Sequence, residues 1–105
     1  MDFDLGNMGA MLAGFQQRMA DMKAKAAATR CVGEAGGGLV RVTITGDNEI
    51  VSVEIAEGAM GDREMLEDLV RAATAEALRK VRDAMQESLK ALTGGLPLPP
   101  GLLPF

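Results

Sequence analysis

The chain has 105 residues, a length that fits one domain able to bury about two thirds of its unfolded surface. Its 11 basic and 15 acidic residues give a net charge of −4, which excludes a uniformly basic polycation but not a locally basic surface. Without His, the chain has no imidazole to serve as a general base or a metal ligand. A single Cys, no leader sequence and no long apolar run lead us to expect a soluble, cytoplasmic protein without a cofactor.

The first predicted element is a helix. Residues 1–6 are expected to form a loose lead-in, and a helical pattern then runs from about Asn7 to Thr29. Its apolar residues recur in steps of four and three, the repeat of a coiled-coil seam: Met8, Leu12, Phe15, Met19, Met22 and Ala26. We therefore expect an amphipathic helix that packs on its own domain or on a dimer partner. The other face is only mildly basic, which argues against binding to a membrane surface.

The middle of the chain changes to a period of two, which predicts strands. Residues 39–45 place Val40, Val42 and Ile44 on one face, and after a turn at residues 46–48, residues 50–55 alternate again. In this second strand Val51, Val53 and Ile55 are predicted to point inward. Residues 30–34 could add a third strand at the edge of the sheet, joined through a glycine-rich turn.

The longest predicted element is a helix from Asp62 to Leu92 that contains no proline and no glycine. Its apolar residues share one face, Asp62 can cap its first turn, and residues 93–95 (TGG) end it. At about 1.5 Å per residue the helix is roughly 45 Å long. A chain of this size cannot cover such a helix by itself, so part of its apolar stripe must face another molecule.

These elements predict an α+β fold within a single domain of residues 1–105, with helices on one side of a small antiparallel sheet. Residues 94–105 (GGLPLPPGLLPF) form an extended, proline-containing tail that is too apolar for a solvated end. We expect this tail to dock on a groove of the same assembly. The Pro97-to-Pro100 spacing also matches a polyproline ligand, but that match is weak.

A search for catalytic chemistry finds little. Gly33, Gly36, Gly37 and Gly38 fit no nucleotide-binding motif and are interpreted as turn residues. Cys31 has no second Cys and no acid–base partner, so we expect a packed or half-exposed strand residue rather than a nucleophile. We therefore predict neither an enzyme nor a small-molecule substrate.

Basic residues are concentrated in two places, and they predict contact with nucleic acid. Residues 62–76 carry two bases and five acids, whereas residues 79–92 carry four bases and two acids, and the first helix is weakly basic. If subunits pair, these patches double and can grip a phosphate backbone from two sides. Scattered aromatic residues offer no platform for single strands, so duplex DNA is preferred. The candidate DNA-binding residues are Arg18, Lys23, Lys25, Arg79, Lys80, Arg82 and Lys90.

Several segments together resemble the YbaB/EbfC family of bacterial nucleoid-associated proteins. They are GEAGGGLVRVTITG at residues 33–46, VEI at 53–55, MLEDLV at 65–70, the Ala pair at 72–73 and LPPG at 98–101. The resemblance implies an α-β-β-β-α subunit in a tweezers-like homodimer that binds duplex DNA in the nucleoid and has no catalytic activity.

The predicted dimer rests on the sheet edge and on the outward apolar stripe of the long helix, with the C-terminal tail as a further candidate contact. Its candidate interface residues are Val40, Val42, Leu66, Leu69, Val70 and Ala73. An alternative function is a dimeric adapter that binds a recombination or repair protein and has little direct contact with DNA. Neither hypothesis involves a membrane or a metal.

Overall fold

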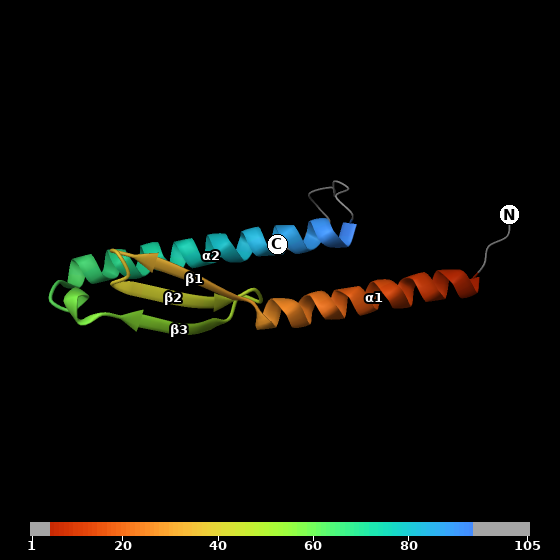
Figure 1. Cartoon of the computed structure of the whole chain (residues 1–105), viewed down its shortest axis with the longest axis horizontal. Helices are drawn as coiled ribbons and strands as arrows, with labels where there is room; N and C mark the ends of the chain where they lie inside the picture. Colours follow the sequence, from red (N-terminus) through yellow and green to blue (C-terminus); the bar gives the residue numbers. More distant parts are fainter. Residues whose placement is uncertain (1–4, 94–105) are drawn as a thin grey trace.

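The computed structural model describes residues 5–93 and has the predicted α-β-β-β-α order (Figure 1). The elements are α1 (Leu5–Ala28), β1 (Arg30–Ala35), β2 (Val40–Thr45), β3 (Ile50–Ile55), the short 3-10 helix η1 (Glu57–Ala59) and α2 (Arg63–Thr93). Leu5 and Gly6, predicted to belong to the lead-in, are part of α1. The predicted tail, residues 94–105, lies outside the described residues.

The three strands form one antiparallel sheet in the order β1-β2-β3. The β1–β2 connection uses Gly36, Gly37 and Gly38, whose φ angles of +66°, +68° and +92° favour glycine. Gly33, which the sequence analysis assigned to a turn, instead lies inside β1 opposite Val42. Its pairing with Val42 makes it a strand residue, and the close approach of α2 explains why this strand position holds a glycine.

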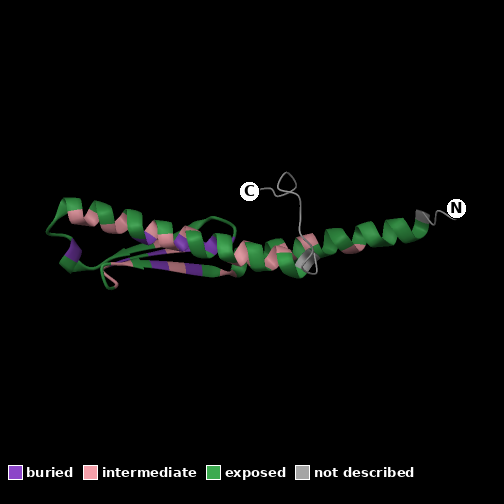
Figure 2. Ribbon diagram, turned by 90° about the horizontal axis from the view of Figure 1, so that it is seen from above, coloured by how far each residue is buried: buried purple, intermediate pink, exposed green. Residues whose placement is uncertain are grey.

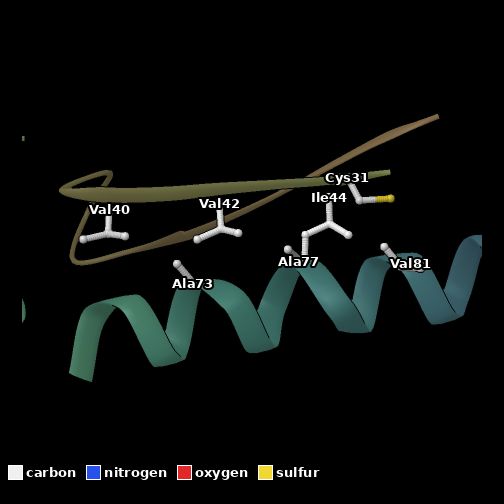
Figure 3. Packing of buried hydrophobic residues seen from close by; sticks show 7 residues of the cluster. All are labelled: Cys31, Val40, Val42, Ile44, Ala73, Ala77 and Val81. Atoms are coloured by element: carbon white, nitrogen blue, oxygen red, sulfur yellow. The ribbon is translucent and has the colours of Figure 1, made fainter. Parts of the chain in front are cut away.

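The core lies between one face of β1 and β2 and the first two thirds of α2 (Figure 3). Its buried residues are Cys31, Val40, Val42, Ile44, Ala73, Ala77 and Val81. The helix contributes mainly alanines, which allow its backbone to approach the sheet closely. Burying each Val or Ile stabilises the fold by about 1.5–3 kcal/mol. The core contains few such residues, so each contributes a large share of the stability. Cys31 is packed within it, which is the first of the two placements expected from the sequence.

The face of β3 is not covered by α2, in contrast to the prediction for its inward residues. Val53 pairs with Val42 and Ile55 with Val40, so each shares the helix-facing side of the sheet with its partner. Nevertheless Val53 and Ile55 are 49% and 41% exposed, and Val51 is exposed as well. The reason is the position of α2, which packs on β1 and β2 and lies farthest from β3 (Figure 1).

The two helices are fixed at their junctions with the sheet. Asp62 caps α2 as predicted, because its Oδ1 accepts a hydrogen bond of 3.1 Å from the backbone N–H of Met65. At the other end of the sheet, the N–H of Gly46 donates to the carbonyl of Thr29 directly after α1. These contacts set α1 beside the second half of α2, and α1 then extends past the end of α2 (Figure 1).

Candidate nucleic-acid interface

The structure brings basic residues of α1 next to the C-terminal half of α2. Arg18 and Lys25 line a shallow groove of about 260 Å³ together with Ser88 and Ala91 of α2. Asp21 also lines this groove and offsets part of its positive charge. Lys23, in contrast, is two residues from Lys25 and therefore points to the opposite side of α1.

The outward face of α2 carries a cationic stripe. Positions 71, 75, 79, 82, 86 and 90 follow one another in steps of three and four, so they share one face of the helix. All of them are exposed, and they are Arg71, Ala75, Arg79, Arg82, Gln86 and Lys90. No acid occupies this stripe. Arg71 is absent from the predicted site because net charge was counted by segment, whereas helical phase would have included it.

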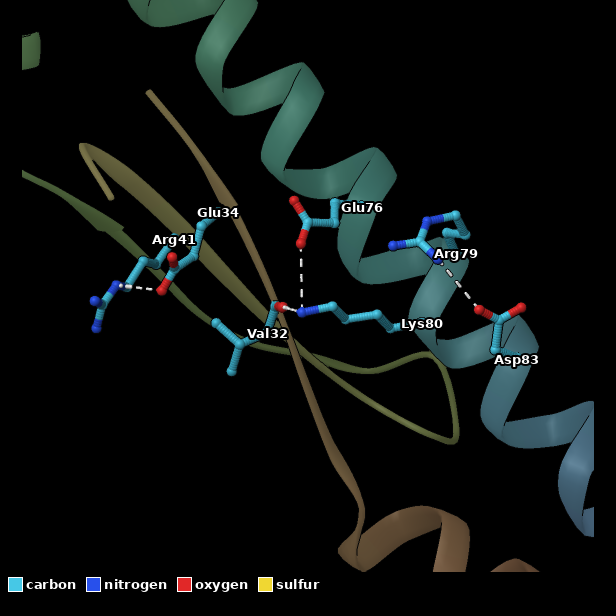
Figure 4. Close-up of polar contacts among 7 residues, drawn as sticks. All are labelled: Val32, Glu34, Arg41, Glu76, Arg79, Lys80 and Asp83. Carbon is cyan, nitrogen blue, oxygen red and sulfur yellow. Dashed lines mark hydrogen bonds and ion pairs between the residues drawn. The ribbon is translucent and has the colours of Figure 1, made fainter. Parts of the chain in front are cut away.

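Two of the predicted DNA-binding residues are engaged within the subunit (Figure 4). Arg79 Nη1 lies 3.3 Å from Asp83 Oδ2. Lys80 Nζ donates a 2.7 Å hydrogen bond to the carbonyl oxygen of Val32 and lies 3.3 Å from Glu76 Oε1. Because it joins α2 to the edge strand β1, Lys80 has a structural role in the subunit.

The remaining predicted cations are exposed and form no ion pair with any other residue in the range 5–93. They are Arg18, Lys23, Lys25, Arg82 and Lys90. Arg82 and Lys90 on the outward stripe, and Arg18 and Lys25 beside Asp21 at the groove, therefore have no ion-pair partner within residues 5–93 and can contact an external anion. Exposed Lys and Arg side chains of this kind are the groups that neutralise phosphates.

The residues predicted for the dimer interface divide into two groups. Val40, Val42 and Ala73 are fully buried within the subunit because they form the contact between β2 and α2. The others, Leu66, Leu69 and Val70, are half-buried at the rim of this core. Sequence reasoning missed that Val53 and Ile55 stay exposed, since alternation identifies a face of a strand but not what covers it.

Other kinds of site find no support among the described residues. Residues 5–93 contain no group of three or more Cys, Asp or Glu side chains placed to hold a metal ion. Neither α1 nor α2, within the described part of the chain, has a stretch long and apolar enough to cross a membrane.

Comparison with known proteins identifies the family. The model of the YbaB/EbfC DNA-binding family matches residues 1–96. The chain is 47% identical over 91 residues to a nucleoid-associated protein of Polynucleobacter necessarius subsp. necessarius, a match that covers 86% of this chain and 85% of the relative. It is 42% identical over 105 residues to a nucleoid-associated protein of Maricaulis maris, with 97% and 98% covered.

The fold has a counterpart among solved structures. An uncharacterized protein of Helicobacter pylori superposes with a TM-score of 0.78 at 21% identity, covering 88% of this chain and 99% of that one. This likeness concerns the fold alone, and it matches the order of helices and strands described above. The family model matches nearly the whole chain, and two relatives share more than 40% of its residues. The chain therefore belongs to the YbaB/EbfC DNA-binding family.

Proposed function

We propose that this protein binds duplex DNA in the bacterial nucleoid, as a homodimer that contacts mainly the phosphate backbone. The observation that carries the proposal is the cationic stripe of α2, which runs from Arg71 to Lys90 without an acid. Membership of a DNA-binding family supports it, as do the names of the nucleoid-associated relatives. The basic residues Arg18 and Lys25 of α1 lie against Ser88 and Ala91 of α2, which by helical phase face away from the stripe, so they form a second basic site.

The dimensions of the stripe suit a phosphate backbone. Arg71 and Lys90, the two ends of the stripe, are nineteen residues apart, which corresponds to about 28 Å along the helix. Phosphates of one strand follow one another at about 3.4 Å of helix axis, so the stripe can span several of them. Contacts of Arg and Lys with phosphates fix position without reading bases, so we expect weak sequence selectivity.

A second copy of the chain is the partner that the open face of β3 fits. Within the described residues β3 pairs on one side only, with β2, and its exposed Val53 and Ile55 continue the apolar core of the subunit. Val70 and Leu78 lie by helical phase on the side of α2 that faces away from β1, so they border the same open face. Self-association would bury this face and double the number of cationic stripes.

The test is a mobility shift of a duplex at two salt concentrations. With about six phosphates neutralised, the logarithm of affinity should fall with the logarithm of salt at a slope of about −5. The variant Arg82→Gln/Lys90→Gln removes two unpaired cations of the stripe. It should weaken binding and flatten the slope by about 1 for each phosphate that is no longer neutralised.

The matched control is Arg41→Gln/Arg63→Gln, which changes the net charge equally but alters residues outside the stripe. This control should bind DNA as the wild type does. An absent shift at low salt, a slope near zero, or equal reductions of affinity in both variants would contradict the proposed contact surface.

A second candidate function is a dimeric adapter for a recombination or repair protein. The first turns of α2 favour it, since Glu64 and Asp68 are exposed and make no ion pair within residues 5–93, and the whole chain is acidic. Such a surface suits a basic protein partner rather than a phosphate backbone. A protein that dimerises but shifts no duplex at low salt would favour the adapter.

A further inference from the structure

We propose that the C-terminal segment, residues 94–105, docks on the uncovered apolar stripe of α1 in its own chain. The stripe consists of Met8, Met11, Leu12 and Phe15. The inference goes beyond DNA binding and does not depend on it. It concerns how α1, which carries Arg18 and Lys25, is held in place.

Within the described part of the chain, the apolar face of α1 is covered over only half its length. Met19, Met22 and Ala26 are half-buried where α1 runs beside the second half of α2. Farther toward the N-terminus the same face continues, but its large side chains are 49–67% exposed (Figure 2). Met8, Gly9, Met11 and Leu12 line an open groove of about 460 Å³. Such a contiguous apolar patch on a soluble subunit marks an interaction site.

The end of α2 lies where the uncovered part of the face begins. Ala91 lines the same groove as Arg18 and Met22, so the last turns of α2 reach the middle of α1. From Arg18 to Met8 the distance along α1 is about 15 Å. Residues 94–105 follow directly after α2, and twelve extended residues span up to about 40 Å. The segment is therefore long enough to reach the whole stripe of its own chain.

The composition of residues 94–105 suits docking on the apolar stripe of α1. The sequence GGLPLPPGLLPF has no charged side chain, and it offers four leucines and one phenylalanine for burial. Its four prolines restrict the free segment, which lowers the entropy cost of docking. Met8 and Met11 are flexible side chains that adapt to an irregular ligand of this kind.

A coiled coil with a second copy is the competing use of the stripe. Such a seam needs about three to four heptads to be stable, whereas the exposed stretch from Met8 to Phe15 covers only about one. Gly9 and Gly14 further weaken an isolated helix here, by about 1 kcal/mol each relative to Ala. An apolar segment tethered at the edge of the patch is favoured over a free partner by its high local concentration.

The experiment uses the full-length chain with ¹³C-labelled methionine methyl groups and no DNA. NMR signals of Met8 and Met11 report on the stripe, whereas Met60 and Met65 report on the opposite end of the subunit. The variant Leu102→Asn/Leu103→Asn should shift the Met8 and Met11 signals and leave those of Met60 and Met65 in place. The control Gly94→Ser/Gly101→Ser alters the same segment without removing an apolar side chain, so it should leave all four signals unchanged.

Three different NMR results would overturn the proposal. Identical Met8 and Met11 signals in the wild type and the Asn variant would exclude docking of the segment. Signals that respond to dilution but not to the Asn substitutions would assign the stripe to a seam between copies. A mixture of the labelled Asn variant with unlabelled wild type separates docking within one chain from docking between copies. Docking within one chain predicts that the Met8 and Met11 signals keep the shifts of the variant. A return of these signals to the wild-type shifts would show that the segment of a second copy occupies the stripe.

Discussion

Gly33 determines how closely α2 approaches the sheet. A Cβ atom at this position would lie 2.0 Å from the carbonyl oxygen of Ala73 and 2.5 Å from the backbone nitrogen of Ala77. Both neighbours are backbone atoms of a helix, so they cannot turn aside as the end of a flexible side chain would. The small residues on each side therefore form a direct contact between strand and helix backbones.

Replacing Gly33 by Ala should destabilise the protein by about 1–3 kcal/mol, because the helix must shift away from β1 and the core then packs less closely. The midpoint of urea unfolding measures this effect. Gly61→Ala serves as the control, since a Cβ there meets no atom within 4 Å, and it should change stability by less than about 0.5 kcal/mol. A Gly33 variant as stable as that control would contradict the close packing.

Substitutions at Lys80 and Arg82 should have different effects, the first mainly on the free energy of unfolding and the second mainly on DNA affinity. Lys80→Gln removes the hydrogen bond to the Val32 carbonyl and should cost about 1 kcal/mol, a value reduced by the partial exposure of the side chain. Arg82→Gln should leave stability almost unchanged and weaken DNA binding more than Lys80→Gln does. Urea unfolding and mobility shifts of the two variants test this, and the opposite order would contradict the roles assigned here.

Among the elements, β3 and α1 each present an apolar face that no other part of residues 5–93 covers. For β3 the cause is the width of the sheet, because one helix that packs on β1 and β2 cannot also cover a third strand. For α1 the cause is the length of the helix, which continues past the end of α2 (Figure 1). We assign a second copy to the first face and residues 94–105 to the second.

The face of β3 should control self-association. Val53→Asp/Ile55→Asp places charges where a second copy would exclude water, so light scattering should report half the wild-type mass. Ser52→Asp adds an acid on the opposite face of the same strand and should leave the dimer intact. A wild-type protein that is a well-folded monomer at micromolar concentration would contradict the proposed assembly.

The whole molecule is much longer than a compact domain of this size. Its extents are 72 × 24 × 16 Å and its radius of gyration is 19.4 Å, against about 13 Å expected for a compact chain of this length. The difference arises because α1 extends away from the sheet instead of folding onto it. Elongated subunits joined at the sheet would place their projecting helices as arms, the arrangement that the resemblance implies.

Dimerisation and DNA binding should be coupled at this scale. A monomeric Val53→Asp/Ile55→Asp variant keeps one cationic stripe instead of two, so its salt slope should fall to about half that of the wild type. Affinity should fall with it, whereas Ser52→Asp should retain the wild-type slope. A monomer with an unchanged slope would show that one subunit makes all the phosphate contacts.

The sequence by itself determined the two helices, the strands β2 and β3 and the cap at Asp62, whereas hydrophobic period left β1 open and the family resemblance supplied it. Hydrophobic period and capping are local properties, so the residues within an element suffice to predict them. The segments resembling the YbaB/EbfC family also identified the family that the comparison established.

Only the tertiary structure decided which apolar faces are covered. It assigned Val40 and Val42 to the core, left Val53 and Ile55 exposed, and tied Lys80 to β1. Alternation and helical phase state which side chains share a face, but coverage depends on where α2 crosses the sheet. That crossing is set by contacts between residues far apart in the chain, such as Gly33 with Ala73 and Ala77, and no local pattern encodes them.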